Sequence, residues 1–491
     1  MKNDEKYGIL FKPAIQLRKL ICSKKISPID ITNLALERIE EINPKINAFL
    51  TVTPDSALEK AKEVEKKILN GEPMGLLAGI PTSIKDLEPM KGVRQTKGSL
   101  VFKDFVADID QIAVERIKNE DGIILGKTNT PEFGQSGTTE NKLGDHCRNP
   151  WDLECVAGGS SGGAGASVAS GITPVAQGSD GGGSIRIPSA FCGIYGIKGT
   201  QGRVPRRNIS NLSWHPVNYS CMGPMSRYVT DSALFLQVLS GPHPQAEFGT
   251  LTNSAPDFLI DIEKGVSGKL IGWSPDLGSR IVDDEVKNIT ENAVKTFEDL
   301  GANVELLNFD INLDELENPL HNVLSFVLIY ATNGFLLKEN SDLLMHYVRN
   351  TLEKGKNISA DEYLRALTKL YEFRDKIEQI FEKYDFISTP TMAIPAFECN
   401  KRPFFEKQKI KFKDLDDEHY DYSNWNFQLT QFTALFNWSG NPAAALPCGF
   451  SSSGLPVSLQ IVGKKEDEIG VLQASRAFEK IKPWHDIHPD I

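Results

Sequence analysis

The chain is poor in the residues and segments that mark several classes of protein. Its 491 residues include seven cysteines and eight histidines, and no two cysteines form the Cys-x-x-Cys pair that binds zinc or exchanges disulfides. The longest apolar run, residues 323–331, is interrupted by Ser325 and falls far short of the ~20 residues that a membrane-spanning helix needs. We therefore expect reduced, mostly buried thiols and no membrane span.

The chain also lacks an excess of basic charge and an apolar leader. Lys and Arg number 54 against 65 Asp and Glu, which gives a formal net charge of −11 with neutral histidines. Proteins that bind nucleic acid or membrane surfaces concentrate Lys and Arg, so this balance argues against both partners. Residues 1–6 contain no apolar stretch like that of a secretory signal, so we expect a cytoplasmic protein.

What is present is an ordinary globular composition, with helical and strand-like segments in alternation. Hydrophobic residues make up 40% of the chain, which is enough for a sizeable core. The alternation is typical of an α/β fold. Residues 1–75 are predicted to be helical cladding. One helix begins after Ser27 and stops at Asn43-Pro44, and a second ends at Gly71.

Further elements follow along the rest of the chain. The predicted helices are residues 109–121, 284–300 and 360–384, and the predicted strands are 76–87 (broken by Pro81), 123–125, 304–307 and 386–388. Residues 401–427 are charged and aromatic without clear periodicity, so we expect a long surface loop or lid that includes Trp425. Length alone suggests about three domains, but no repeat or flexible linker separates them.

Two glycine-rich loops, residues 158–163 and 178–184, place serines among glycines. Glycine allows positive φ angles and lets backbone N–H groups point at a ligand, so such loops hold a phosphate or a developing oxyanion. A Walker loop needs a lysine after its last glycine, but Ala164 follows Gly163, and neither loop has the Gly-x-Gly-x-x-Gly spacing of a dinucleotide site. The oxyanion interpretation is therefore favoured over nucleotide binding.

The first loop also satisfies the Gly-x-Ser-x-Gly pattern of a nucleophile elbow, with Ser160 at its centre. An elbow serine follows a buried strand, whereas residues 149–154 are polar and turn-like. The elbow also needs a later acid and histidine, and only Asp486 and His488, almost at the end of the chain, would serve. An elbow with a histidine triad is therefore a disfavoured alternative.

Without a histidine, a lysine can deprotonate a serine when burial disfavours its ammonium form and lowers its pKa. Lys85 lies in a strand-like apolar segment, residues 79–86, where a lone lysine is otherwise hard to justify. The alternative is a lysine that extends its ammonium group to the surface or pairs with an acid. Lys85 is therefore the candidate base for a serine in one of the two loops.

The run from Gly158 to Thr200 resembles the signature of the amidase signature family of serine amidohydrolases. It reads Gly-Gly-Ser-Ser-Gly-Gly at its start, Gly-Gly-Ser-Ile-Arg-Ile-Pro-Ser-Ala-Phe-Cys-Gly in its middle and Gly-Ile-Lys-Gly-Thr at its end. Segments 79–86, 125–133 and 454–463 resemble other parts of the family, so the resemblance covers nearly the whole chain.

The resemblance implies an α/β fold with one large domain, residues 1–491. Its mixed central sheet would have helices on both faces. Within it, residues 76–210 would form the signature core, and residues 211–491 would complete the sheet.

The resemblance also assigns roles to residues at matching positions. Ser184 matches the nucleophile, Ser160 the bridging serine that a cis peptide bond holds in the family, and Lys85 the general base. The oxyanion hole would be formed by the backbone N–H groups of Gly181, Gly182, Gly183 and Ser184. Four residues would support the loops or the hydrogen-bond network rather than react: Ser161, Ser179, Asp180 and Arg186.

Departures from the family pattern bear on the substrate. The A subunits of glutaminyl/aspartyl-tRNA amidotransferases belong to this family and usually carry Gln where this chain has Ile187. This difference counts against an amidotransferase role. The sequences of residues 148–151 and of the C-terminal half resemble those of bacterial amidases that include 6-aminohexanoate-cyclic-dimer hydrolase. Phe436 and Trp438 lie in a segment near the substrate in this family and would offer an apolar wall, although core packing explains them equally well.

The sequence thus predicts an amidase that hydrolyses carbon–nitrogen bonds of small amides through an acyl-enzyme on Ser184, without a cofactor or a metal. The alternatives are a hydrolase of cyclic or linear oligoamides or carbamates, one component of an amidotransferase that works with partner chains, and a catalytically silent binding protein on the same scaffold. The expected partner is a small-molecule amide. Dimers are common in the family, so a homodimer is the candidate assembly.

Overall fold

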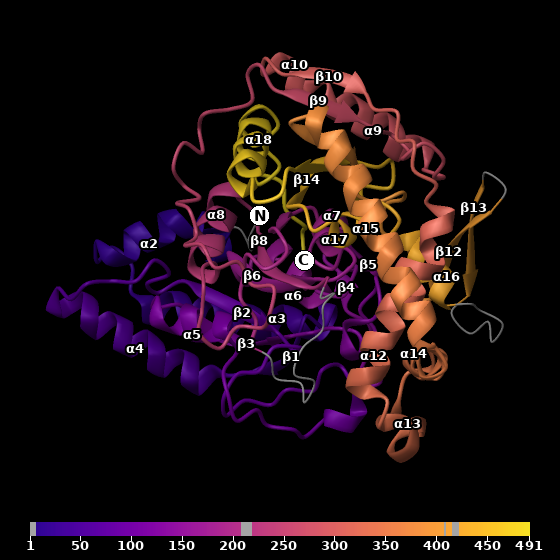
Figure 1. The fold of residues 1–491 in the computed structure, drawn as a ribbon. Coiled ribbons are helices and arrows are strands. Elements are labelled where there is room, and N and C mark those ends of the chain that lie inside the picture. The colour runs from indigo at the N-terminus through magenta and orange to yellow at the C-terminus, as the bar shows by residue number, and fades with distance from the viewer. Residues whose placement is uncertain (1–5, 208–218, 407–408, 415–421) are drawn as a thin grey trace.

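A computed structural model describes residues 6–207, 219–406, 409–414 and 422–491 (Figure 1). Eleven strands of these residues form one sheet. In order across the sheet they are β1 (Phe49–Val52), β3 (Ile123–Thr128), β2 (Pro81–Lys85), β6 (Val175–Asp180), β8 (Cys221–Ser226), β7 (Tyr195–Lys198), β14 (Ala443–Phe450), β15 (Pro456–Gly463), β11 (Phe386–Pro390), β9 (Leu270–Trp273) and β10 (Asn303–Leu306).

The sheet is mixed, and its order does not follow the chain. Strand β2 is parallel to β3 and β6, and β9 is parallel to β10 and β11, whereas the pairs from β6 through β8, β7 and β14 to β15 are antiparallel. Strands β14 and β15, from the C-terminal end, lie between β7 and β11. Because both ends of the chain contribute to one sheet, the chain is a single α/β domain rather than three.

Helices surround the sheet on both sides (Figure 1). They are α2 (Ala14–Cys22), α3 (Pro28–Ile46), α4 (Pro54–Asn70), α5 (Ile112–Asn119), α6 (Gly162–Ala169), α7 (Arg186–Cys192), α8 (Val229–Leu239), α9 (Asp284–Val294), α10 (Thr296–Asp299), α11 (Asp314–Leu316), a π-helix (Glu317–Leu324), α12 (Ser325–Asn333), α13 (Leu336–Glu339), α14 (His346–Lys356), α15 (Ala360–Lys383), α16 (Tyr422–Leu429), α17 (Leu435–Trp438) and α18 (Glu468–Ile481).

Two hydrophobic cores fill the space between helices and sheet. Neighbouring strand residues alternate between them, since Ile461 of β15 packs in the first core and Val462 in the second. Phe478 of α18 belongs to the first core, and Phe373 of α15 belongs to the second. The expectation of helices on both faces of the sheet is confirmed.

Residues 1–75 differ from the prediction in two places. Helix α3 continues through Pro44 to Ile46, and its cap residue Asn47 has a left-handed φ of 48°, so the predicted stop at Asn43-Pro44 is wrong. A proline in the last turn removes one helix hydrogen bond, and the Asn47 N–H still donates to Asn43 O at 2.8 Å. The segment also contains strand β1, which is too short to show periodicity, so it is not purely helical. The predicted end of α4 at Gly71 is confirmed.

Later elements follow the prediction more closely. Helix 360–384 is α15, and strand 386–388 begins β11. The helix predicted at 284–300 is divided into α9 and α10, and the strand predicted at 76–87 is reduced to β2, which begins at Pro81. A proline is tolerated at the first residue of a strand, where its missing N–H matters least.

Residues 401–427 are not a long loop in their described part. They form an antiparallel strand pair followed by α16, the strands being β12 (Lys401–Glu406) and β13 (Lys409–Asp414). The Arg402 side chain is buried against Glu140, and Trp425 is 0% exposed. In β13 lysines alternate with Ile410 and Phe412, a period of two that indicates a strand. The loop prediction is therefore wrong for these residues, and Trp425 is a core residue.

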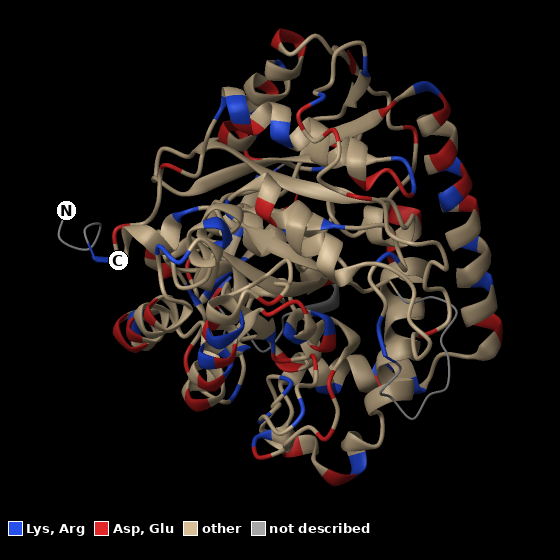
Figure 2. Cartoon of the chain, turned by 90° about the vertical axis from the view of Figure 1, so that its left-hand side faces the viewer, with Lys and Arg blue, Asp and Glu red and all other residues tan. Residues whose placement is uncertain are grey.

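Charge is distributed over the outside of the molecule. In Figure 2 the basic and acidic residues are interspersed along the outer helices and loops, and the central strands carry few of either. Among the residues that the structure describes, none of the helices combines the length and the apolar composition needed to cross a membrane.

Candidate active site

Strand β2 ends at Lys85, in the interior of the sheet between β3 and β6. Every residue of β2 is buried because both faces of the sheet are covered, and Lys85 is 0% exposed. Its backbone N–H donates to Gln177 Oε1 on β6 at 3.0 Å. The strand therefore places the Lys85 amine out of contact with bulk water.

The Lys85 amine contacts three serine hydroxyls. Its Nζ lies 2.7 Å from Ser160 Oγ, 2.9 Å from Ser161 Oγ and 3.1 Å from Ser179 Oγ. The first two serines belong to one glycine loop and the third to the other, so one amine joins both loops. Among the described residues no carboxylate pairs with Lys85, which removes the surface or ion-paired alternative.

Burial lowers the pKa of the Lys85 amine from 10.5 to about 7, because an ammonium group loses its hydration there. The more distant carboxylates of Glu88 and Asp180 oppose this shift, and Arg206 adds to it. Near neutral pH a share of the Lys85 side chains is therefore uncharged and able to accept a proton.

Two other fully buried lysines have partners of a different kind. Lys127 Nζ lies 3.3 Å from Asp86 Oδ1, and Lys198 donates to two backbone carbonyls. Those acceptors have no proton to give. The hydroxyl groups around Lys85 both donate and accept, so only that lysine of the three is placed to exchange protons with its neighbours.

The first glycine loop presents Ser160 through a tightly constrained backbone. The Gly159–Ser160 peptide bond is cis, as the family resemblance implied. Gly158 has a φ of 79°, in the region that favours glycine. A Cβ on Gly159 would lie 2.5 Å from Thr138 O. Side chains are therefore excluded at both positions before Ser160.

The environment of Ser160 differs from that of a nucleophile elbow. Contrary to the turn predicted at residues 149–154, a strand does precede the loop: β5 (Asp152–Val156) pairs with β4 (Arg148–Asn149). This pair forms a ribbon outside the central sheet, whereas an elbow follows a strand of that sheet. The His488 ring stacks on Phe11, at 4.2 Å between centroids. The partner of Ser160 is Lys85, not a histidine.

The second loop begins in the last residues of β6, which ends at Asp180, and leads into α7, with Ser184 as its last residue. Ser184 is partly exposed, and its hydroxyl has no hydrogen-bond partner within the described residues. Its carbonyl oxygen accepts from the Ser161 N–H at 3.2 Å, which joins the two loops. The structure thus brings Lys85 and Ser160 into direct contact and places Ser184 next to them, without a hydrogen bond between the hydroxyls of Ser160 and Ser184.

Asp180 and Arg186 form a buried pair at the base of the second loop. Arg186 Nε donates to Asp180 Oδ2 at 2.9 Å, and Asp180 also accepts from the N–H groups of Gly183 and Ile185. Burial alone would raise the pKa of the Asp180 carboxyl, but the Arg186 guanidinium holds it well below its usual range. Because all of these hydrogen bonds are made within the protein, the Asp180–Arg186 pair holds the loop in its shape.

The N–H groups of the second loop differ in whether they are free. Gly183 N–H donates to Asp180 Oδ1 at 2.6 Å. The N–H groups of Gly181, Gly182 and Ser184 have no partner within the described part of the chain. Unpaired donors beside a serine hydroxyl are the arrangement that a developing oxyanion needs.

The three predicted substrate-contact residues are buried. Ile187, at the start of α7, borders the loop, because a Cβ on Gly183 would lie 2.8 Å from its Cδ1. Phe436 and Trp438 are 0% and 2% exposed and belong to the second core. The Trp438 ring packs edge-on against Phe373, with 6.0 Å between centroids. All three therefore belong to the second core, and Ile187 is the one that also borders the loop.

Sequence reasoning missed side chains that hold the two loops from a distance. Thr433 Oγ1 donates to Gly182 O at 2.6 Å, and Gln460 Oε1 accepts from Arg186 at 2.7 Å. Asn437, which lies between Phe436 and Trp438, donates to the backbone oxygen of Asp180 at 2.7 Å. These partners are more than 250 residues apart in the chain, so no local pattern marks them.

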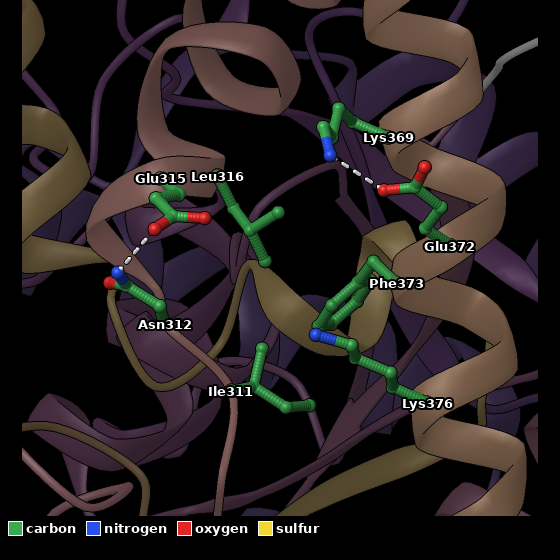
Figure 3. A pocket seen from close by; sticks show the side chains of 8 residues that line it. All are labelled: Ile311, Asn312, Glu315, Leu316, Lys369, Glu372, Phe373 and Lys376. Carbon is green, nitrogen blue, oxygen red and sulfur yellow. Dashed lines mark hydrogen bonds and ion pairs between the residues drawn. The ribbon is translucent and has the colours of Figure 1, made fainter.

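Within the described residues, no group of three or more His, Cys, Asp and Glu side chains is arranged to hold a metal ion. A cleft lies apart from the Lys85 site, between α15 and the segment that leads into the π-helix (Figure 3). Its polar groups pair with one another, Asn312 with Glu315 and Lys369 with Glu372. The cleft is lined by Ile311, Asn312, Glu315, Leu316, Lys369, Glu372, Phe373 and Lys376.

Comparison with known proteins gives relatives along the whole chain. The family model described as Amidase matches residues 30–472. The A component of the glutamyl-tRNA(Gln) amidotransferase from Cyanothece sp. is 33% identical, over 97% of this chain and 99% of its own length. An acylamidase from Rhodococcus erythropolis is 32% identical, over 97% of this chain and 96% of its own length.

Two solved structures have the same architecture. A bacterial aryl acylamidase, described as an amidase signature enzyme, superposes with a TM-score of 0.88 at 31% identity, over 97% of this chain and 98% of its own. The 6-aminohexanoate cyclic dimer hydrolase, solved with its substrate, gives a TM-score of 0.85 at 26% identity, over 98% and 99%. The chain, with its lysine and two serine loops, therefore belongs to the amidase family of amidase signature enzymes.

Proposed function

We propose that this amidase hydrolyses small amides through an acyl-enzyme on Ser184, with Lys85 and Ser160 as its proton relay. The observation that carries the proposal is the 2.7 Å contact between Lys85 Nζ and Ser160 Oγ, in a site that lowers the pKa of the amine to about 7. A neutral amine in that position takes a proton from the serine, and an ammonium group does not.

Acylation begins when Lys85 accepts a proton from Ser160 and Ser160 accepts one from Ser184. The Ser184 oxygen attacks the amide carbonyl, and the carbonyl electron pair moves to its oxygen. The free N–H groups of Gly181, Gly182 and Ser184 stabilise that oxyanion. Gly183, predicted as a further donor, contributes through its backbone shape, because its N–H is bonded to Asp180.

Collapse of the tetrahedral intermediate breaks the carbon–nitrogen bond, and the relay in reverse delivers a proton to the leaving nitrogen. Water then attacks the Ser184 ester and passes its proton to the relay, which releases the acid. In this scheme Ser161 and Ser179 hold the Lys85 amine, with 2.9 and 3.1 Å contacts, and do not react.

The substrate class we propose is a small amide with an apolar aryl or alkyl acyl group. Ile187 supplies an apolar side chain at the edge of the second loop. Phe436 and Trp438 form part of the core behind it and back the wall of the acyl site. The acylamidase and aryl acylamidase names of two similar proteins support this class.

A hydrolysis panel tests the proposal. The purified chain is assayed with aliphatic amides, anilides, cyclic oligoamides and carbamates, beside Ser184→Ala. We expect hydrolysis that Ser184→Ala abolishes, and labelling of Ser184 by a fluorophosphonate probe. Wild-type activity in a folded Ser184→Ala variant would contradict the acyl-enzyme.

The second candidate is a component of an amidotransferase, which the 33% identity to part of a glutamyl-tRNA(Gln) amidotransferase supports. Ile187 in place of the usual glutamine speaks against it. Hydrolysis of simple amides by the chain alone dismisses this candidate, whereas activity that appears only with added partner chains and glutamine establishes it.

We also propose that the protein is cytoplasmic, which its seven free cysteines support. We further propose that it forms a homodimer, which the frequency of dimers in the family supports. Sedimentation of the purified chain tests the assembly. A single species with the 54.3 kDa mass of one chain would rule the dimer out.

A further inference from the structure

At Gly181 and Gly182 the second loop has little packing to hold it. The Cβ position of Gly182 has no atom within 4 Å, and that of Gly181 meets only Ser220, at 3.7 Å or more. Glycine peptides rotate readily because no side chain restricts them. Unless hydrogen bonds hold these peptides, their carbonyl groups can turn toward the position of the substrate oxyanion, where N–H groups are needed.

The Gly182–Gly183 peptide is held at both ends. Its carbonyl oxygen accepts from Thr433 Oγ1 at 2.6 Å, and its N–H donates to Asp180 Oδ1 at 2.6 Å. Because the C=O and N–H of a trans peptide point in opposite directions, the two bonds together fix the plane. The Thr433 side chain also occupies the space that a Cβ on Gly183 would need.

The Asp180–Gly181 peptide, two peptides earlier, is held from the same segment. Asn437, four residues after Thr433, donates to Asp180 O at 2.7 Å. That bond turns the N–H of Gly181 away from Asn437. Two side chains from the C-terminal half therefore set the direction of peptide groups in a loop that the signature core provides.

We propose that Thr433 is a positioning residue for the oxyanion hole. Its hydroxyl keeps Gly182 O bonded within the protein, so that this oxygen does not turn toward the oxyanion beside the free N–H groups of Gly181, Gly182 and Ser184. This inference rests on the proposed function, because it concerns the oxyanion of the Ser184 reaction. A carbonyl oxygen turned toward that oxyanion would repel it, and removal of one oxyanion donor in other hydrolases lowers kcat about 10²–10³-fold.

The experiment compares Thr433→Val, which keeps the shape and removes the hydroxyl, with Thr433→Ser, which keeps the hydroxyl. We expect Thr433→Val to lower kcat about tenfold or more with KM within about twofold, since only the transition state carries the oxyanion. A trifluoromethyl ketone, which forms a tetrahedral adduct with a serine, should bind more weakly by the same factor. Thr433→Ser should restore both values.

The matched control is Thr290→Val, because Thr290 is buried in α9 and donates to Val286 O at 2.7 Å. It should lose comparable stability and keep wild-type kcat. If Thr433→Val does not fold, Thr433→Ala takes its place in the comparison with Thr433→Ser. Wild-type kcat without the hydroxyl, or no recovery with serine, would overturn the inference. Activity in Ser184→Ala would instead overturn the proposed function.

Discussion

At the scale of single residues, the site depends on one amine that is kept out of water. The pKa of Lys85 falls from 10.5 to about 7, so between these pH values the unfolded chain binds a proton that the folded chain does not. Lys85 therefore destabilises the folded chain progressively as pH falls from 10.5 to 7, and by a constant amount below 7. The same shift supplies a neutral base at neutral pH.

This shift predicts the pH dependence of the reaction. Below pH 7 the Lys85 amine is protonated and cannot accept the Ser160 proton, so kcat/KM should fall about tenfold per pH unit. Above about pH 8 it should level off. A pH–rate profile from pH 5 to 9 checks this, with the melting temperature followed in parallel to exclude unfolding. A profile that is flat across pH 7 would show that Lys85 is not the base.

At the scale of elements, the second loop joins β6 to α7 without room for side chains on its inner side. Gly183 has a φ of 129°, and its missing Cβ would collide with Thr433 and lie 2.8 Å from Ile187 Cδ1. Gly182, one residue earlier, faces open space. The two adjacent positions are therefore glycine for different reasons. Gly183 has a φ and a packing that exclude a side chain, whereas Gly182 leaves the approach to the site open.

Alanine substitutions separate these two reasons. Gly183→Ala should destabilise the protein by about 1–3 kcal/mol, because overpacking and an unfavourable φ add together, and it should lower kcat strongly. Gly182→Ala should leave the urea midpoint of unfolding unchanged, since no protein atom lies within 4 Å of the added Cβ. Equal stability losses in the two variants would refute this distinction.

At the scale of the whole molecule, buried polar contacts connect the signature core to the C-terminal half. Arg186 of α7 bonds to Asp180 at the end of β6, and also reaches Gln460 on β15 and Asn437 on α17. The contacts with Gln460 and Asn437 join residues far apart in the chain. The shape of the loop thus depends on the complete domain.

Arg186→Met should accordingly destabilise the whole domain. It leaves the buried Asp180 carboxylate without its charged partner, which costs about 3–5 kcal/mol in comparable cases. The matched control is Arg365→Met on α15, whose pair with Asp361 is exposed to solvent, and we expect no measurable change there. Urea unfolding of both variants gives the comparison. An Arg186→Met protein as stable as the control would contradict the structural role.

Much of the site was predictable because its chemistry lies in short contiguous segments. Lys85, Ser160 and Ser184 are each marked by local context, an apolar strand or a glycine run, and the family resemblance relates them. Thr433 carries no such context, and Gln460, although it lies in the family-like segment 454–463, has no local sign of its role. Each works through a partner more than 250 residues away. The ribbon of β4 and β5 was missed because short, polar strands resemble loops in sequence, and β13 was missed although its lysines alternate with Ile410 and Phe412.

The sequence by itself determined elements that local physics governs: the end of α4, the extent of α15, which loops need glycine, and that Lys85 stands in an apolar strand. Only the tertiary structure decided which strands are neighbours, that three hydroxyls surround the Lys85 amine and that the Gly183 N–H is bonded to Asp180. The reason is that hydrogen bonds and desolvation act through space, and the pairings that bring these groups together form only when both halves of the chain share one sheet.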